Sequence, residues 1–175
     1  DSRKPLLLIV EDNDDMRSYI RSYLADAYRI SEANNGKMGL EKAIEAIPDL
    51  VISDVMMPEM DGNEMCAKLK SDERTSHIPV IILTARASMQ SKIQGLETGA
   101  DDFITKPFDS HELKVRVKNL IVQRKKLHDR FIKKIQKTGL DHMLEIENED
   151  FTPPDQQFMQ RVVNIILKYL SDPEF

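Results

Sequence analysis

The chain has 175 residues, of which 41% are apolar and 31% are charged, and its formal net charge is −5. This length holds one ordinary domain with an appendage, or two small domains. The negative charge excludes the basic footprint of a typical nucleic-acid-binding domain. A single cysteine, Cys66, excludes an internal disulfide framework. Because no apolar run approaches the roughly 20 residues that cross a membrane, we expect a cytoplasmic location without membrane contact.

Strand-like and helix-like segments alternate five times along the first 120 residues or so. The predicted strands cover residues 6–10, 28–33, 50–54, 79–83 and 102–104. Apolar residues at helical spacing follow them at residues 16–24, 38–47, 65–69, 89–96 and 113–120. We expect Asp14 or Asp15 to cap the first helix and Asp109 to cap the fifth. The alternation predicts a doubly wound α/β domain, a five-stranded parallel sheet with helices on both faces.

Polar side chains occupy the carboxyl ends of four predicted strands, the edge at which open parallel sheets bind ligands. Glu11 and Asp12 follow the first strand, and Asp54 ends the third. Thr84 ends the fourth strand, and Lys106 follows the fifth. Asp54 by itself would fit a helix cap or a loop acceptor as readily as a nucleophile or a metal ligand. The other strand-end residues favour the second interpretation.

The chemistry of these five side chains points to phosphoryl transfer. Three carboxylates at one edge repel each other unless a cation lies among them. Mg²⁺ suits such a site, since it prefers oxygen ligands and takes only one or two carboxylates directly. Lys106 adds an ammonium group for a phosphate oxygen, and Thr84 adds a hydroxyl donor. A nucleophilic carboxylate in this setting predicts an aspartyl phosphate.

Several segments in this order resemble one known family. They are residues 8–13, 53–58, 61–62, 82–85 and 99–108. Over about residues 5–122 the chain resembles a response-regulator receiver domain of bacterial two-component signalling. The resemblance implies a flavodoxin-like sheet with strand order 2-1-3-4-5. It also implies a histidine kinase domain as the phosphodonor.

The same resemblance implies a role for each residue of the acidic site. Asp54 would be the phosphoacceptor and, together with Asp12, a ligand of Mg²⁺. Glu11 would reach the ion through water, and the backbone carbonyl of Met56 would be another ligand. Met56 would also flank the phosphoryl group with Arg86, and we expect this pair to tune the rate of dephosphorylation.

Two further residues are implied to bind the phosphoryl group, Thr84 and Lys106, with a cis bond between Lys106 and Pro107. The switch of this family pairs the threonine with an aromatic residue on the fifth strand, here Phe103. Many members have Tyr at that place, and Phe lacks the hydroxyl. Phe103 is therefore either a switch that acts by packing alone or an ordinary core residue.

Other functions of these carboxylates fit the sequence less well. A phosphatase of the haloacid-dehalogenase type needs a second Asp two positions after its nucleophile, where this chain has Met56. A nucleotide-binding module needs a glycine-rich loop after the first strand, where this chain has acids. We expect a domain that assists its own phosphorylation and dephosphorylation without being an enzyme for external substrates. The second hypothesis is a constitutive dimerisation scaffold in which phosphorylation is dispensable.

The pattern of the fifth helix continues beyond Asn119 and predicts one helix to about residue 137. Its apolar positions are Leu113, Val117, Leu120, Leu127, Phe131 and Ile135. The extension is either a signalling helix that pairs in a homodimer or a solvated linker helix. We favour the homodimer, because the apolar residues after Arg124 would otherwise be exposed. We assign residues 1–122 to the receiver domain and 123–150 to a helical extension and linker.

The pattern of residues 151–175 predicts another helix with a broad apolar face. A helix without a packing partner does not bury such a face. From Asp150 onward the chain resembles the lead-in to AraC-type DNA-binding domains of hybrid two-component regulators, most of all in residues 171–175. This resemblance implies that the chain contacts DNA only through a domain beyond Phe175. It also implies that a sensor and a histidine kinase precede Asp1, in agreement with a first residue that is not methionine.

Overall fold

Five parallel strands form a single sheet in a computed structural model that describes residues 4–85 and 99–138. The strands are β1 Leu6–Val10, β2 Arg29–Ala33, β3 Leu50–Asp54, β4 Val80–Thr84 and β5 Asp102–Thr105. Their order is β2-β1-β3-β4-β5, which confirms the predicted flavodoxin-like topology. The chain divides into two compact units, Asp1–Val122 and Gln123–Phe175, and the sheet belongs to the first.

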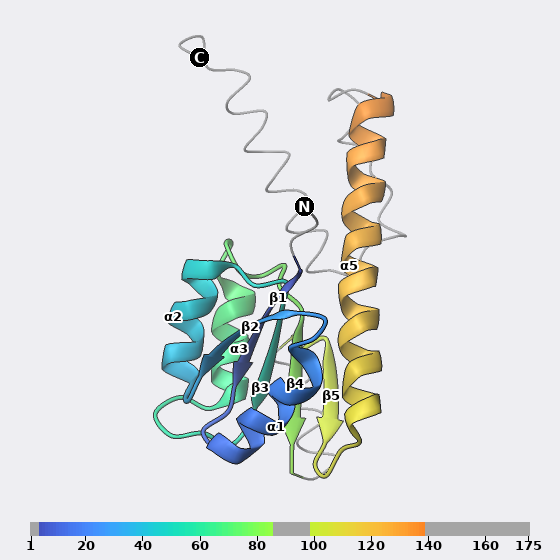
Figure 1. The fold of residues 1–175 in the computed structure, drawn as a ribbon. Helices are drawn as coiled ribbons and strands as arrows, with labels where there is room; N and C mark the ends of the chain where they lie inside the picture. Colours follow the sequence, from blue (N-terminus) through green and yellow to red (C-terminus); the bar gives the residue numbers. More distant parts are fainter. Residues whose placement is uncertain (1–3, 86–98, 139–175) are drawn as a thin grey trace. The chain divides into compact units, whose positions relative to one another are not determined.

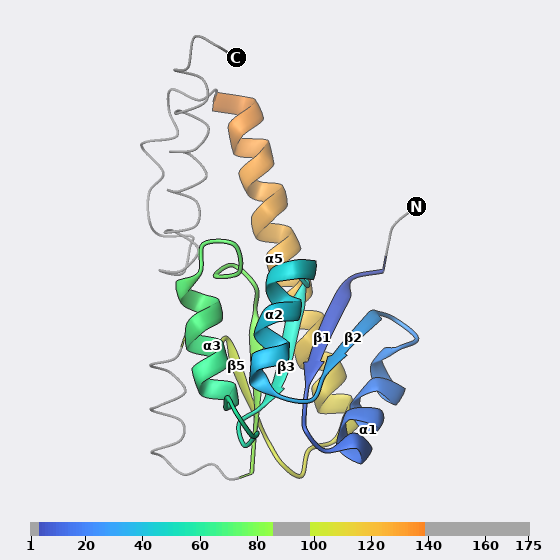
Figure 2. The same ribbon diagram turned by 90° about the vertical axis from the view of Figure 1, so that its left-hand side faces the viewer.

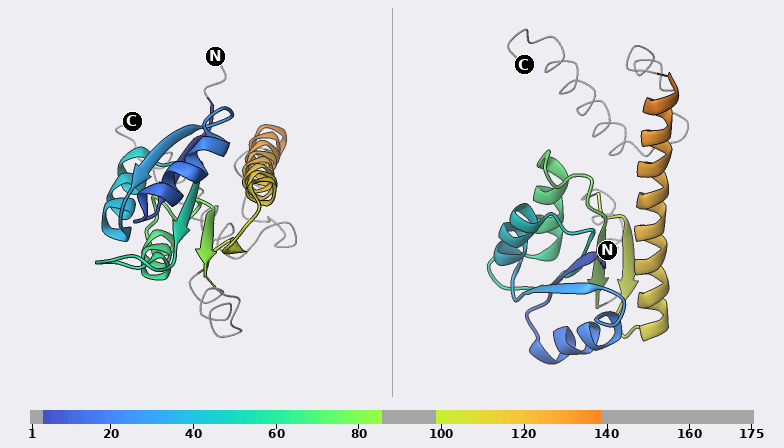
Figure 3. Two further views of the ribbon diagram at one scale, coloured as in Figure 1. Left: turned by 60° about the horizontal axis from the view of Figure 1, so that its bottom comes forward. Right: turned by 45° about the horizontal axis from the view of Figure 1, so that its top comes forward.

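Helices cover both faces of the sheet (Figures 1 and 2). They are α1 Asp14–Leu24, α2 Gly36–Ala46, α3 Gly62–Ser71 and α5 Ser110–Thr138. The first half of α5 lies with α1 on one face, whereas α2 and α3 lie on the other, as Figure 3 also shows. The predicted helix around residues 89–96 lies outside the described residues. Within those residues, no helix is long and apolar enough to span a bilayer.

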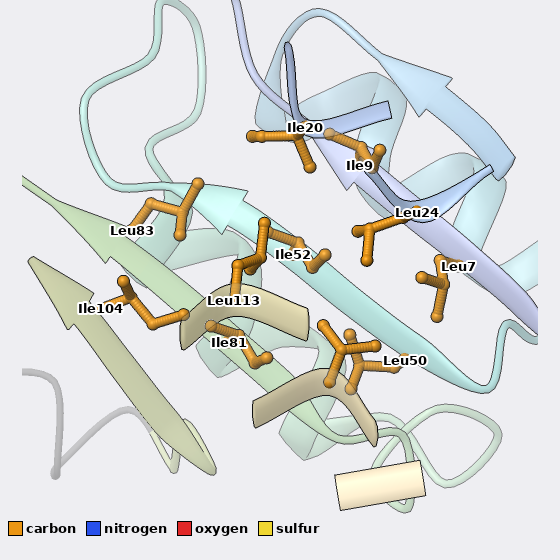
Figure 4. Packing of buried hydrophobic residues seen from close by; sticks show 11 residues of the cluster. Leu7, Ile9, Ile20, Leu24, Leu50, Ile52, Ile81, Leu83, Ile104 and Leu113 are labelled. Atoms are coloured by element: carbon orange, nitrogen blue, oxygen red, sulfur yellow. The ribbon is translucent and has the colours of Figure 1, made fainter. Parts of the chain in front are cut away.

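The apolar runs of the central strands are continuous because side chains of both faces are buried. Alternate residues of each central strand face the side of the sheet that α1 and α5 cover (Figure 4). There α1 contributes Ile20 and Leu24, and α5 contributes Leu113 and Val117. On the opposite face α2 and α3 contribute Ala43, Met65, Cys66 and Leu69. Every residue of β3 and β4 is buried. This two-sided burial is typical of parallel sheets.

Helices α1, α2 and α3 begin at side-chain caps. The cap of α1 is Asn13, whose side chain accepts a hydrogen bond from the Met16 N–H at 2.8 Å. The prediction that Asp14 or Asp15 caps this helix was wrong by one or two residues. Both acids lie in the first turn instead, where negative charge interacts favourably with the helix dipole. The caps fix where α1 and α2 begin, three or four residues after the end of the preceding strand.

The long helix α5 faces its own sheet at the start. Leu113 and Val117 are completely buried, and Leu120 packs against the same cluster. Val115 and Val122 lie on the outer side, each 41% exposed. The first part of the predicted apolar stripe therefore belongs to the core of this domain. If this apolar stripe pairs with a second copy of the chain, the paired part begins after Leu120.

Candidate functional site

Three carboxylates meet at the carboxyl edge of the sheet. Glu11 and Asp12 follow β1, and Asp54 ends β3, the parallel neighbour in which Ser53 is paired with Val10. One oxygen from each of Glu11, Asp12 and Asp54 lies within 4.8 Å of the others. Glu11 and Asp54 are buried, whereas Asp12 is exposed. The parallel register thus creates a concentrated negative charge with one side open to solvent.

The ammonium group of Lys106 lies among these acids. Its Nζ is 2.8 Å from Oε2 of Glu11 and 3.1 Å from Oδ2 of Asp54. Lys106 follows β5, two strands away from Asp54, and its backbone N–H donates to the carbonyl of Thr84 at 2.7 Å. The predicted cis bond between Lys106 and Pro107 is confirmed. A lysine from the far edge of the sheet therefore reaches the acids across β4.

Burial and charge raise the pKa values of two groups at this site, each for a different dominant reason. Burial raises the pKa of Glu11 above its usual value, and the lowering effect of the hydrogen bond from Lys106 does not cancel it. Burial also acts to lower the pKa of Lys106, but the bond to Glu11 and the charge of Asp54 outweigh it, so this pKa is raised. Lys106 consequently stays protonated at neutral pH, and burial disfavours the charged form of Glu11.

The donor set fits a hard divalent cation. The converging oxygens of Glu11, Asp12 and Asp54 are the ligand type that Mg²⁺ prefers. Two of the three carboxylates already surround a positive charge, the ammonium group of Lys106. Asp12, exposed beside them, provides a ligand with access from solvent.

Three other predicted site residues belong to β4, β5 and the loop after β3. Met56 belongs to the loop after β3, and its side chain is 72% exposed. Thr84 is the buried last residue of β4. Phe103 pairs with Ile82 on β4, so alternation puts Phe103 and Thr84 on the same face of the sheet. Arg86 lies outside the described residues.

Residues of α1 line the same open pocket, which sequence reasoning did not assign to the site. Asp15, Met16 and Tyr19 stand beside the acids and Lys106. The ring of Tyr19 is 4.8 Å from that of Tyr23 and 6.3 Å from that of Phe108. The spacing of Met16 and Tyr19, one helical turn apart directly after the acids, was the signal that could have identified them. The pocket wall is therefore partly aromatic and apolar.

The comparisons with known proteins agree with this geometry. Residues 7–118 match the family described as the response regulator receiver domain. The chain is 39% identical over 175 residues to histidine kinase P4 of Formosa agariphila, and 42% identical over 118 residues to the transcriptional regulator RpaA of Synechocystis. These alignments cover 100% and 67% of the chain but only 12% and 49% of those two proteins.

A solved structure with the same fold carries a metal in its site. It is the receiver domain of the sensor histidine kinase PA1611 from Pseudomonas aeruginosa, with a magnesium ion coordinated in the active-site cleft. The TM-score is 0.63 at 27% sequence identity, over 67% of this chain and 97% of that one.

The strand order, the strand-end acids and the lysine among them define a doubly wound α/β domain of the phosphoryl-accepting class. The match over residues 7–118 identifies the particular family. The chain belongs to the response-regulator receiver domains, and it acts as a phosphoacceptor in two-component signalling.

Proposed function

We propose that Asp54 accepts the phosphoryl group. The observation that carries this proposal is the fixed orientation of its carboxylate beside a solvent-open pocket. Oδ1 accepts a hydrogen bond from the Val55 N–H at 2.9 Å, and Oδ2 lies 3.1 Å from the ammonium of Lys106. A carboxylate held at both oxygens is pre-organised for attack, which reduces the entropy lost on the way to the transition state.

In the proposed step an oxygen of Asp54 attacks the phosphorus of a phosphohistidine or of acetyl phosphate. The bond from phosphorus to the donor nitrogen or oxygen breaks, and the leaving group takes the electron pair. Lys106 neutralises charge on the phosphoryl oxygens, and the hydroxyl of Thr84 donates to one of them. Glu11, Asp12, Asp54 and the carbonyl of Met56 would hold Mg²⁺, which when bound supplies further charge neutralisation to the phosphoryl oxygens.

Phosphorylation then changes the domain through β4 and β5. The new dianion draws Thr84 and Lys106 towards it, and this shift favours a second arrangement of the β4–β5–α5 side. Because Phe103 shares a sheet face with Thr84, its ring is suited to follow that movement by packing. Met56 and Arg86 tune the rate at which the phosphoryl group is lost.

The partners belong to the parent protein. We propose a phosphodonor histidine kinase domain in the same polypeptide, which the alignment of the whole chain to a histidine kinase supports. In this proposal residues 1–122 form the receiver, and 123–150 are a helical extension and linker that pairs in a homodimer. The helix predicted over residues 151–175, which would lead to a DNA-binding domain, lies outside the described residues. The output is transcriptional, and the location is the bacterial cytoplasm.

Replacement of Asp54 tests the central assignment. We expect Asp54→Asn to abolish labelling by radioactive acetyl phosphate in the presence of Mg²⁺, because the amide is not a nucleophile for phosphorus. The matched control is Asp61→Asn, seven residues away at the cap of α3, where Asn caps as well as Asp. Labelling of the Asp54→Asn protein at the wild-type level would refute the assignment.

A further inference from the structure

The loop of residues 55–61 connects β3 to α3 and is attached at two places. One is the bond from the Gly62 N–H to the carbonyl of Val55 at 2.9 Å, which joins the two ends of the loop. At the other attachment the N–H of Gly36, the first residue of α2, donates to the carbonyl of Met60 at 3.2 Å. A helix from a different part of the chain therefore holds this loop.

The contact between Gly36 and the loop leaves no room for a side chain. A Cβ at Gly36 would lie 2.3 Å from the carbonyl oxygen of Met60 and 3.0 Å from its carbonyl carbon. These are backbone atoms, so no rotamer change relieves the overlap, and either the loop or the start of α2 has to move. Asn35, the cap of α2, adds a second link, because its Nδ2 lies 3.4 Å from Oε1 of Glu59.

The backbone of the loop adopts a conformation that its own sequence does not favour. Glu59 has φ of 66°, in the left-handed region that non-glycine residues rarely occupy. Such a conformation persists where surrounding contacts enforce it. Here those contacts are the two described above, between Asn35 and Glu59 and between Gly36 and Met60.

We infer that Gly36 is a positioning residue for the metal site. The first turn of α2 holds Glu59 and Met60, and through them the loop that carries Met56, whose carbonyl would be a ligand of the cation. This inference depends on the proposed function, which puts that carbonyl among the Mg²⁺ ligands. Mg²⁺ requires near-ideal octahedral geometry with ligands at about 2.0–2.1 Å, so a loop displaced by a few tenths of an ångström binds it less well.

The test is a Mg²⁺ titration of Gly36→Ala by isothermal titration calorimetry, with Gly39→Ala as the matched control. A Cβ at Gly39 in the same helix would approach Met65 Sδ at 2.7 Å and a Val10 methyl at 2.9 Å, which are core side chains and not the loop. We expect Gly36→Ala to raise the Kd for Mg²⁺ about tenfold, as outer-shell substitutions do. Gly39→Ala lowers the melting temperature without Mg²⁺ and keeps the wild-type Kd.

An unchanged Kd in Gly36→Ala overturns the inference, and so does an equal loss of affinity in both variants. If circular dichroism shows that Gly36→Ala does not fold, Asn35→Ser decides. Serine keeps the cap of α2 but is too short to reach Glu59. It should raise the Kd about two- to threefold, the loss expected for one hydrogen bond, and an unchanged Kd overturns the inference. Wild-type protein that binds no Mg²⁺ refutes the metal site itself, whereas wild-type binding with unaffected variants refutes only the positioning role.

Discussion

Single residues at the carboxyl edge of the sheet are placed for binding at some cost in stability. Glu11 is only 1% exposed, and its carboxyl group is close enough to Asp54 for the two negative charges to repel each other. A buried carboxylate is costly unless it is paired, and Lys106 pairs with both acids at once. The site therefore combines burial, which opposes the charge on Glu11, with an ammonium group that makes the charge tolerable.

The pH dependence of stability should reveal this cost. The pKa of Glu11 in the folded state lies above the ordinary value of 4.5, so between these two values the folded state binds more protons than the unfolded state. The contribution of Glu11 to the free energy of unfolding is therefore present below pH 4.5 and is lost as the pH rises through the raised pKa. Denaturant titrations without Mg²⁺ should show the wild type losing stability relative to Glu11→Gln over that window. Glu45→Gln, at an exposed position of α2, is the control for a lost charge. Parallel pH curves of wild type and Glu11→Gln would contradict the prediction.

Among the elements, α5 has a buried face and an exposed face in its first turns. Its first three turns pack on the sheet through Leu113 and Val117, while Val115 and Val122 look outward. A periodic apolar stripe predicts that a helix is buried on one side, but it does not say whether the partner is the same domain or a second copy. In residues 113–120 the partner is the sheet of the same domain.

A pair of substitutions in α5 tests this division. We expect Leu113→Ala to lower the free energy of unfolding by about 2–4 kcal/mol, because it leaves a cavity in the buried cluster that also contains Ile52 and Leu83. Val115→Ala, two residues away on the outer side, should change it by less than about 0.5 kcal/mol. Urea denaturation followed by circular dichroism measures both values. Equal effects would show that α5 does not dock as described.

At the scale of the molecule, the acidic edge couples cation binding to folding. The oxygens of Glu11, Asp12 and Asp54 come within 4.8 Å of one another only when β1 and β3 are paired. The unfolded chain has no such site, so a cation that binds it shifts the equilibrium towards the folded domain.

Mg²⁺ should therefore raise the melting temperature. At a free concentration one hundred times its Kd, the ion stabilises the fold by about 2.7 kcal/mol. Asp12→Asn should reduce this effect strongly, since Asp12 is the exposed carboxylate of the three. Calorimetric scans across millimolar Mg²⁺, with Asp26→Asn at an exposed position after α1 as the control, measure the difference. A transition temperature that does not respond to Mg²⁺ would count against the site.

The sequence pattern by itself determined the alternation of strands and helices and the edge at which Glu11, Asp12, Asp54 and Lys106 meet, whereas the strand order followed from the family resemblance. Periodicity identified parallel strands and crossover helices, and the carboxyl ends of parallel strands share one edge. Only the tertiary structure decided that Lys106 bridges two acids, that Tyr19 borders the pocket, and that Gly36 touches the loop after β3. It likewise decided which partner buries the start of α5. The reason is physical, because a local pattern records the face that a residue presents, whereas its contacts depend on segments far away in the chain.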